Sequence, residues 1–309
     1  MSVYLTGRFD AGERDDWLAL LRAELPGESF VVDRAEAAEA DIAVVANPPP
    51  GALQGLPRLK LIQSLWAGVE KLLADDSIPA GLPIARMVDP AMNAAMAETA
   101  LWATLSLHRG FFAYAARQRA GQWRPHAQRR ADETAVAVLG LGQMGRTAAL
   151  RIAGQGYRVT GWSRGPATVE GLRVAHGDAA LEPVLRGAHV VINLLPLTDA
   201  TRGLFDARRL AWLKPTAGLV NLARGAHVVD ADLLAALDAG ALRHAVLDVF
   251  TTEPLPAGHR YWSHPRVTLL PHAAALTDAR SAAVVAAANL RRFRRGEVPQ
   301  HLVERARGY

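Results

Sequence analysis

The sequence of 309 residues contains no cysteine. Disulfide bonds, thiolate nucleophiles and zinc sites with cysteine ligands are therefore excluded. No stretch is as long and as unbroken in apolar residues as a membrane span requires. The first residues, MSVYLTGRFD, lack the basic and then apolar pattern of a signal peptide. We therefore expect a cytoplasmic protein without a membrane partner.

Acidic residues are fewer than basic ones, and the formal net charge is +5. A basic balance is typical of nucleic-acid-binding proteins, but here the arginines are dispersed along the chain. The one dense cluster, at residues 291–295, falls at the end of an expected helix, where cations complement the helix dipole. We expect no nucleic-acid partner, and the positive charge would instead attract an anionic substrate and cofactor.

The length exceeds that of a usual single hydrophobic core, so two domains are expected. Strands and helices alternate from residue 135 to about residue 271, which is typical of a doubly wound parallel sheet of the Rossmann type. We predict an α/β protein in which this dinucleotide-binding domain spans residues 98–274. A smaller, flavodoxin-like substrate-binding domain would combine residues 1–97 with 275–309.

The apolar patterns predict a series of strands and helices. The expected strands are 3–6, 30–32, 42–46, 59–65, 135–139, 157–162, 188–195, 217–222, 244–250 and 267–270. The expected helices are 15–24, 93–119, 143–153 and 278–295. The second of these helices is too apolar for a single exposed face, so it is expected to pack between domains and against a partner subunit.

The stretch AVAVLGLGQMGRTAALRIAGQGYRVTGWSR, residues 135–164, combines a strand, a glycine turn, a helix and a second strand. In that context G-x-G-x-x-G indicates a dinucleotide-binding site. Gly140 would permit the tight turn, and Gly142 would let the backbone approach the pyrophosphate. Gly145 would let the helix pack closely against the sheet.

The phosphates are expected at the start of the helix, at Gln143 and Met144, where free N–H groups and the helix dipole favour anions. An NAD site usually has Asp or Glu at the end of the second strand, to bond the ribose 2′-OH. This chain has Ser163 and Arg164 there instead. A hydroxyl and a guanidinium suit a 2′-phosphate, so we predict NADP(H) as the preferred cofactor, with NAD(H) possible.

Three later strand ends carry Arg224, Glu253 and His272. Ligands of such sheets bind beyond the carboxyl ends of the strands. Together these residues suit the reduction of a 2-oxo acid. Arg224 can grip the carboxylate and polarise the C2 oxygen, and His272 can give that oxygen a proton. Glu253 can hold the other ring nitrogen of the histidine and favour the imidazolium.

A turn in the N-terminal region, Trp66-Ala67-Gly68-Val69, follows another expected strand. Backbone N–H groups in such a turn can hold a carboxylate, although a plain connection between strand and helix explains the pattern equally well. The indole of Trp66 would either narrow the acyl side of a substrate pocket or point into the core.

The sequence resembles the D-isomer-specific 2-hydroxyacid dehydrogenases, and most of all their glyoxylate/hydroxypyruvate reductase branch of A-type bacterial enzymes. The resemblance rests on WAGVE, VLGLGQMG, WSR, VINLLPLT, NLARGAHVVDADLLAALDAG, LDVFTTEPLP, HPRVTLLPHAAA and RARGY, which occur in the order of the family. It implies the roles given above for the Arg–Glu–His set, and backbone contacts from Ala67, Gly68 and Val69 to the substrate carboxylate. It also implies a homodimer joined through the nucleotide domain. The residues that it implies around the cofactor are Leu195, Pro196, Thr198, Leu222, Ala223, Asp248 and Ala274.

The sequence therefore predicts an NADPH-preferring reductase of small 2-oxo acids, glyoxylate or hydroxypyruvate, that uses no metal ion. Other 2-hydroxyacid dehydrogenase activities, on phosphoglycerate, lactate-type substrates, formate or phosphite, stay open as alternatives. A dinucleotide-sensing interaction protein, like the corepressors that share this fold, is a further alternative from a different class.

Overall fold

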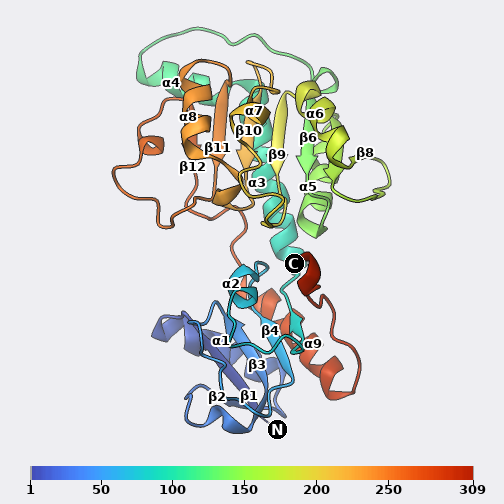
Figure 1. The fold of residues 1–309 in the computed structure, drawn as a ribbon. Coiled ribbons are helices and arrows are strands. Elements are labelled where there is room, and N and C mark those ends of the chain that lie inside the picture. Colours follow the sequence, from blue (N-terminus) through green and yellow to red (C-terminus); the bar gives the residue numbers. More distant parts are fainter. Residues whose placement is uncertain (1, 309) are drawn as a thin grey trace. The chain divides into compact units, whose positions relative to one another are not determined.

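The computed structural model describes residues 2–308 and divides into two compact units (Figure 1). Unit 1 comprises the residues up to Ala91 together with those from Thr277 onward, and unit 2 runs from Met92 to Leu276. The chain therefore passes from one unit to the other twice, and the sequence predicts these two crossings after residues 97 and 274 instead. The first crossing comes earlier in the structure because Met96 and Ala97 already pack in the core of unit 2.

The sheet of unit 1 has five strands in the order β2-β1-β3-β4-β5, and all of its pairs are parallel. Its strands are β1 (Ser2–Gly7), β2 (Ser29–Val31), β3 (Ala40–Ala46), β4 (Leu61–Ser64) and β5 (Ile84–Ala85). Its helices are α1 (Ala11–Glu24), α2 (Glu70–Leu73) and α9 (Ala279–Arg294). Every residue of β3 is buried, as expected for a strand covered on both faces.

The sheet of unit 2 has seven strands in the order β12-β11-β10-β9-β6-β7-β8, again all parallel. These strands are β6 (Ala135–Leu139), β7 (Arg158–Ser163), β8 (Arg173–His176), β9 (Val190–Asn193), β10 (Gly218–Asn221), β11 (His244–Leu247) and β12 (Val267–Leu269). The helices are α3 (Pro90–Arg109), α4 (Phe111–Arg119), α5 (Gln143–Ala153), α6 (Asp178–Gly187), α7 (Ala207–Leu210) and α8 (Asp230–Asp238). The predicted doubly wound parallel fold is confirmed.

Alternate residues of the central strands of unit 2 enter two separate cores. Leu139, Val191 and Leu219 pack on one face with residues of α6, α7 and α8. Val138 and Ile192 pack on the opposite face with residues of α3 and α5. Because side chains alternate along a strand, a sheet buried on both faces needs continuous apolar runs. Such runs are what made these strands predictable.

The prediction of a single helix at residues 93–119 is wrong in one respect. The segment forms two helices, α3 and α4, which are separated by Gly110 in a left-handed conformation with φ of 75°. A left-handed residue ends an α-helix, and glycine adopts that conformation without a steric penalty. Two short strands, β5 and β8, are not among the predicted elements.

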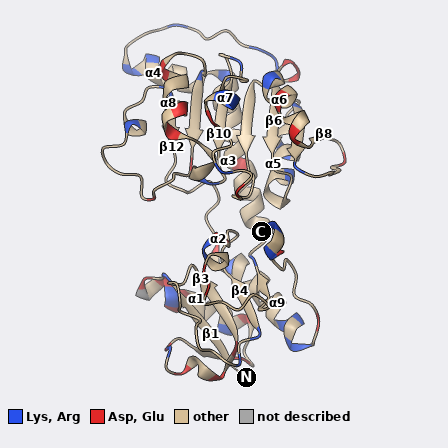
Figure 2. Ribbon diagram, viewed as in Figure 1, with Lys and Arg blue, Asp and Glu red and all other residues tan. Residues whose placement is uncertain are grey.

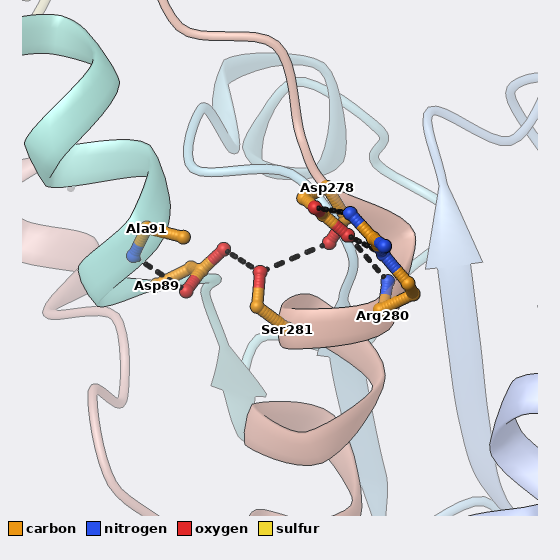
Figure 3. A network of polar contacts seen from close by, with 5 residues as sticks. All are labelled: Asp89, Ala91, Asp278, Arg280 and Ser281. Carbon is orange, nitrogen blue, oxygen red and sulfur yellow. Dashed lines mark hydrogen bonds and ion pairs between the residues drawn. The ribbon is translucent and has the colours of Figure 1, made fainter.

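The two chain crossings are tied together inside unit 1 (Figure 3). Asp89, which is buried, accepts a hydrogen bond from the backbone N–H of Ala91 at 3.0 Å, at the start of α3. Its second oxygen accepts a hydrogen bond from Ser281 Oγ, in the first turn of α9, at 2.7 Å. Asp278 caps α9 by accepting from the backbone N–H of Arg280. The start of each helix is therefore fixed by a carboxylate.

Charged residues of both signs are interspersed over both units (Figure 2). The arginine cluster at the end of α9 follows this pattern, because each of its members has an acidic partner. The pairs are Arg291–Glu24, Arg292–Glu297, Arg294 with Glu28 and Asp41, and Arg295–Glu297. Arg291 and Arg294 therefore fix α9 to other elements of unit 1, whereas Arg292 and Arg295 pair with Glu297 just beyond the end of the helix.

Candidate active site

The glycine motif lies between β6 and the start of α5, and each glycine has a different environment. A Cβ on Gly145 would lie 1.8 Å from the carbonyl oxygen of Gly140, so no side chain fits there. Gly140 has a φ of 95° and would clash with the backbone of Leu194. A Cβ on Gly142, in contrast, would meet no atom within 4 Å. Gly142 therefore faces open space at the helix N-terminus, and a pyrophosphate fits there.

The end of β7 carries the two residues expected at the adenosine ribose. Ser163 is its last residue and donates a hydrogen bond from Oγ to the carbonyl oxygen of Gly165 at 2.7 Å. Arg164 follows and is exposed. Within residues 2–308 its guanidinium forms no hydrogen bond or ion pair. A cation without a counter-ion beside this strand end can bind a 2′-phosphate, which agrees with the predicted preference for NADP(H).

His272 and Glu253 form a direct pair at the same edge of the sheet. Nδ1 of His272 lies 2.7 Å from Oε2 of Glu253. The other carboxylate oxygen of Glu253 accepts a hydrogen bond from the backbone N–H of Phe250 at 2.9 Å. The backbone of its own loop therefore fixes the carboxylate, and the carboxylate in turn orients the imidazole with Nδ1 as the protonated nitrogen. Nε2 is the nitrogen left for a substrate.

The backbone at His272 adopts a left-handed conformation with φ of 54°. For a residue with a side chain this conformation costs about 1–3 kcal/mol, so neighbouring bonds must hold it. The N–H of His272 donates to the carbonyl oxygen of Asp248 at 2.8 Å. Oδ1 of Asp248 accepts the N–H groups of Ala273 and Ala274, at 2.7 and 3.1 Å. Burial raises the pKa of the Asp248 carboxyl, and these two bonds oppose that rise.

Arg224 follows β10, and its loop lies directly against the loop that carries Glu253. A Cβ on the next residue, Gly225, would lie 1.9 Å from the carbonyl carbon of Phe250. Only glycine therefore allows the two backbones to approach this closely. The guanidinium of Arg224 donates from Nη1 to the carbonyl oxygen of Ala223 at 2.6 Å. Arg224, Glu253 and His272 thus come from three neighbouring strand ends: β10, β11 and β12.

The residues expected around the cofactor follow the carboxyl ends of these and the adjacent strand. Leu195, Pro196 and Thr198 come after β9, and the others come after β10, β11 and β12. Thr198 is fixed by its N–H, which donates to Thr201 Oγ1 at 2.8 Å. The carboxylate of Asp248 is used by the backbone, as described above, so this residue contributes structure rather than a free acid.

Sequence reasoning missed three buried polar side chains beneath these loops. Asn193, Asn221 and His227 each have no exposed surface. Asn193 Nδ2 donates to Asn221 Oδ1 at 2.9 Å, and Asn221 Nδ2 donates to the carbonyl oxygen of Arg224 at 2.9 Å. The available signal was a polar residue at the end of each of two otherwise apolar strands.

In unit 1, the turn Trp66–Val69 follows β4. Ser64 fixes the turn: its Oγ donates to the carbonyl oxygen of Trp66 at 2.9 Å and accepts the N–H of the same residue at 3.0 Å. The indole of Trp66 packs edge-on against buried Trp17, with ring centroids 6.3 Å apart. The ring therefore points toward the core of unit 1. Within residues 2–308 the backbone N–H groups of Ala67, Gly68 and Val69 donate no hydrogen bond to the protein.

Within residues 2–308, no helix is long and apolar enough to cross a membrane. No group of three or more His, Asp or Glu residues in that range is arranged to hold a metal ion.

Unit 2 thus has the parallel sheet, the glycine turn and the strand-end residues of a dinucleotide-dependent oxidoreductase domain. Residues 101–274 match the family model described as D-isomer specific 2-hydroxyacid dehydrogenase, NAD binding domain. The chain belongs to this family of D-isomer-specific 2-hydroxyacid dehydrogenases. The resemblance drawn from the sequence motifs is confirmed.

Relatives and solved structures agree with this assignment. A glyoxylate/hydroxypyruvate reductase A from Serratia proteamaculans is 38% identical over 301 residues, which cover 96% of each chain. A D-isomer specific 2-hydroxyacid dehydrogenase from Xanthobacter autotrophicus, solved with NADPH and MES, is 39% identical, with a TM-score of 0.94 over 100% of this chain and 99% of that chain. An NADPH-dependent glyoxylate/hydroxypyruvate reductase from Sinorhizobium meliloti, solved with NADP and sulfate, is 33% identical, with a TM-score of 0.91 over both whole chains.

Proposed function

We propose that this protein reduces glyoxylate and hydroxypyruvate to the corresponding 2-hydroxy acids with NADPH. The observation that carries the proposal is the 2.7 Å contact between His272 and Glu253, next to the Arg224 loop and on the same sheet edge as the glycine motif. The named activities of the relatives from Serratia and Sinorhizobium support the choice of substrate.

The roles of the three residues follow from their chemistry. When bound, NADPH supplies the hydride that adds to C2 of the 2-oxo acid. The guanidinium of Arg224 binds the substrate carboxylate through paired hydrogen bonds and polarises the C2 oxygen. His272 donates the Nε2 proton to that oxygen as negative charge develops on it. Glu253 stabilises the imidazolium before the transfer and holds the ring in one orientation.

The two units have different proposed tasks. Unit 2 binds the dinucleotide at Gly142, in the turn that Gly140 and Gly145 make possible, with Arg164 and Ser163 at the 2′-phosphate. Unit 1 binds the substrate carboxylate through the N–H groups of residues 67–69, which donate to no other group in the described part of the chain.

The proposal is tested by following NADPH absorbance with glyoxylate, hydroxypyruvate and pyruvate, each repeated with NADH. Turnover with at least the first two substrates is expected, and the absence of turnover with every 2-oxo acid would contradict the proposal. An Arg224→Lys variant keeps the charge but loses the bidentate fork, so kcat/KM is expected to fall about 100-fold. NADPH affinity of that variant, measured by nicotinamide fluorescence, is expected to stay unchanged.

We also propose that the protein is a homodimer joined through unit 2. Three large aromatic side chains of this unit are exposed: Trp102 on α3, Phe111 on α4 and Trp123 in the segment that follows α4. Their exposures relative to a fully exposed residue are 40%, 50% and 102%. Large exposed aromatic residues are enriched at protein interfaces. Light scattering coupled to size exclusion is expected to give twice the chain mass, and a Trp123→Ser variant is expected to shift the equilibrium toward monomer. A monomeric mass for the wild type at micromolar concentration would contradict this proposal.

The proposed cellular location is the cytoplasm, because NADPH is formed and maintained inside cells. Fractionation of cells that express the full chain, with detection by antibody, tests this location. Recovery in the membrane or secreted fraction would contradict it.

A further inference from the structure

Buried His227 lies between two loops of the candidate active site. It is the last residue of the short 3-10 helix Gly225–His227 that begins directly after Arg224. Its side chain has no exposed surface, and its carbonyl oxygen accepts the N–H of Phe205 at 2.8 Å. The residue is therefore fixed by its backbone as well as by its surroundings. The proposed mechanism gives this titratable side chain no direct part in the chemistry.

Both ring nitrogens of His227 face carbonyl oxygens. Nδ1 lies 3.1 Å from the carbonyl oxygen of Arg224, and Nε2 lies 3.2 Å from the carbonyl oxygen of Pro196. A carbonyl oxygen only accepts hydrogen bonds, so a hydrogen bond forms only at a ring nitrogen that carries a proton. The imidazolium can donate to both oxygens, and either neutral tautomer can donate to one. One side chain thus connects the loop after β10 with the loop after β9.

The two asparagines connect the same loops from the other side. Asn193 Oδ1 accepts the N–H of Leu195 at 3.3 Å, and the amide of Asn193 donates to Asn221. Asn221 in turn donates to the carbonyl oxygen of Arg224. The bonds therefore form a closed circuit that runs from Leu195 and Pro196 through both asparagines to Arg224, and back through His227. The three side chains in this circuit, those of Asn193, Asn221 and His227, are fully buried.

We propose that His227 is a positioning residue for the reaction, which holds the backbone of Arg224 in register with the Pro196 loop. A buried polar side chain is expensive unless its hydrogen bonds serve a purpose. Here both carbonyl oxygens have a second donor: Asn221 at Arg224, and Thr201 Oγ1 at Pro196, at 2.7 Å. Removing the imidazole therefore leaves neither oxygen without a partner. What is lost is the link between the two loops.

The inference rests on the proposed role of Arg224, and its test separates the two. The variants are His227→Leu, which removes both donors, and His227→Gln, which restores one amide donor. The matched control is Val228→Ala, because Val228 is buried in the next position and its side chain packs in the apolar core below the sheet. Each variant is assayed for melting temperature, for steady-state kinetics with glyoxylate, and for NADPH affinity by fluorescence.

For H227L we expect kcat/KM to fall at least 10-fold, mainly through a higher KM for the 2-oxo acid. NADPH affinity should fall less than kcat/KM does, because the glycine motif and Arg164 lie on other strands and keep their contacts when the Pro196 loop is released. H227Q should recover part of the lost kcat/KM, whereas V228A should lower the melting temperature without changing kcat/KM more than twofold. If H227L behaves like V228A, or if H227Q is no better than H227L, His227 is a structural residue only and the inference is overturned.

Binding of oxamate to the enzyme–NADPH complex provides a readout that does not need turnover. Oxamate carries the carboxylate and carbonyl that Arg224 would grip, and its binding quenches nicotinamide fluorescence. If the wild type binds oxamate but reduces no 2-oxo acid, the proposed function fails while the inference stays testable through the loss of oxamate affinity in H227L. If H227L does not fold, H227Q alone decides: wild-type oxamate affinity and kcat/KM in H227Q would contradict the inference.

Discussion

The imidazole of His272 lies 2.7 Å from a carboxylate oxygen of Glu253, and the second oxygen of that carboxylate is held by the backbone N–H of Phe250. Glu253 therefore has one oxygen fixed by its own loop and one directed at the ring. This arrangement makes the carboxylate a rigid counter-charge for the imidazolium, and its removal should lower the rate.

In a Glu253→Gln variant the imidazolium loses its counter-charge and the ring loses a strong acceptor. The ring is then no longer held by a charged acceptor in the orientation that directs Nε2 at the substrate, so kcat should fall about 10- to 100-fold. Steady-state kinetics with glyoxylate measure this loss, and the melting temperature of the variant shows whether the fold is intact. A folded E253Q variant with the wild-type kcat would show that the carboxylate does not act on His272.

Arg164 is expected to distinguish the two nicotinamide cofactors. In Arg164→Ala, the affinity for NADPH should fall about 10- to 100-fold, because charge-assisted hydrogen bonds to the 2′-phosphate are lost. The affinity for NADH, which lacks that phosphate, should change little. Arg151→Ala is the matched control, since Arg151 is an exposed arginine in the last turn of α5. Equal losses for the two cofactors in R164A would contradict the assignment.

Gly142 and Gly145 should respond differently to the same substitution. In Gly145→Ala the new methyl group collides with the carbonyl oxygen of Gly140, so α5 has to shift and unfolding becomes easier by about 1–3 kcal/mol. In Gly142→Ala the methyl group enters open space, so the melting temperature should stay unchanged while NADPH binding is lost. Calorimetry and fluorescence titration separate the two effects. A stable G142A variant with normal NADPH affinity would place the pyrophosphate elsewhere.

His244 should make stability depend on pH. Its ring stacks on Phe112, with centroids 4.5 Å apart, and Nε2 lies 2.9 Å from Thr268 Oγ1. Burial, together with the charges of Arg243 and His264, lowers the pKa of His244 to about 4. In the unfolded chain His244 takes up a proton near pH 6.5. The neutral, buried ring therefore stabilises the fold fully above that pH, and this stabilisation is lost as the pH falls toward 4. The free energy of unfolding decreases by about 3 kcal/mol over this range.

Urea unfolding at pH 7.0 and pH 4.5 measures this contribution. A His244→Phe variant, which keeps the aromatic ring but does not titrate, should lose less stability between the two pH values than the wild type does. His176→Gln, at an exposed histidine on β8, is the control and should retain the wild-type pH dependence. The same slope in H244F and in the wild type would show that His244 does not contribute.

The sequence predicted the parts of the molecule that depend on local pattern. The strand Ala135–Leu139 and the helix Gln143–Ala153 were predicted with the bounds that the structure has, because a buried apolar run, a glycine turn and an amphipathic helix follow one another. Strand β5 has only two residues and exists because Ile84 pairs with Ile62 of β4. Such a pairing leaves no periodic pattern in the sequence.

The site shows the same division. The strand-end rule points to His272 and Arg224 because each follows a recognisable apolar run. It does not point to His227, which lies three residues beyond Arg224 and meets Pro196 only after two loops have folded together. Contacts between distant segments decide the role of such a residue, and no spacing within one segment encodes them.

Helix α9 belongs to unit 1 although the ribosome makes it after the whole of unit 2. Its Asn289 donates a buried hydrogen bond to Gln63 of β4 at 2.8 Å. During synthesis the first ninety or so residues therefore emerge without α9, so Gln63 lacks its partner Asn289 and the sheet lacks the helix that packs on it. Unit 2 is continuous in sequence and can complete its fold first. Truncation at the carboxyl end should consequently damage the amino-terminal sheet, and the nascent chain should depend on chaperones until α9 is released.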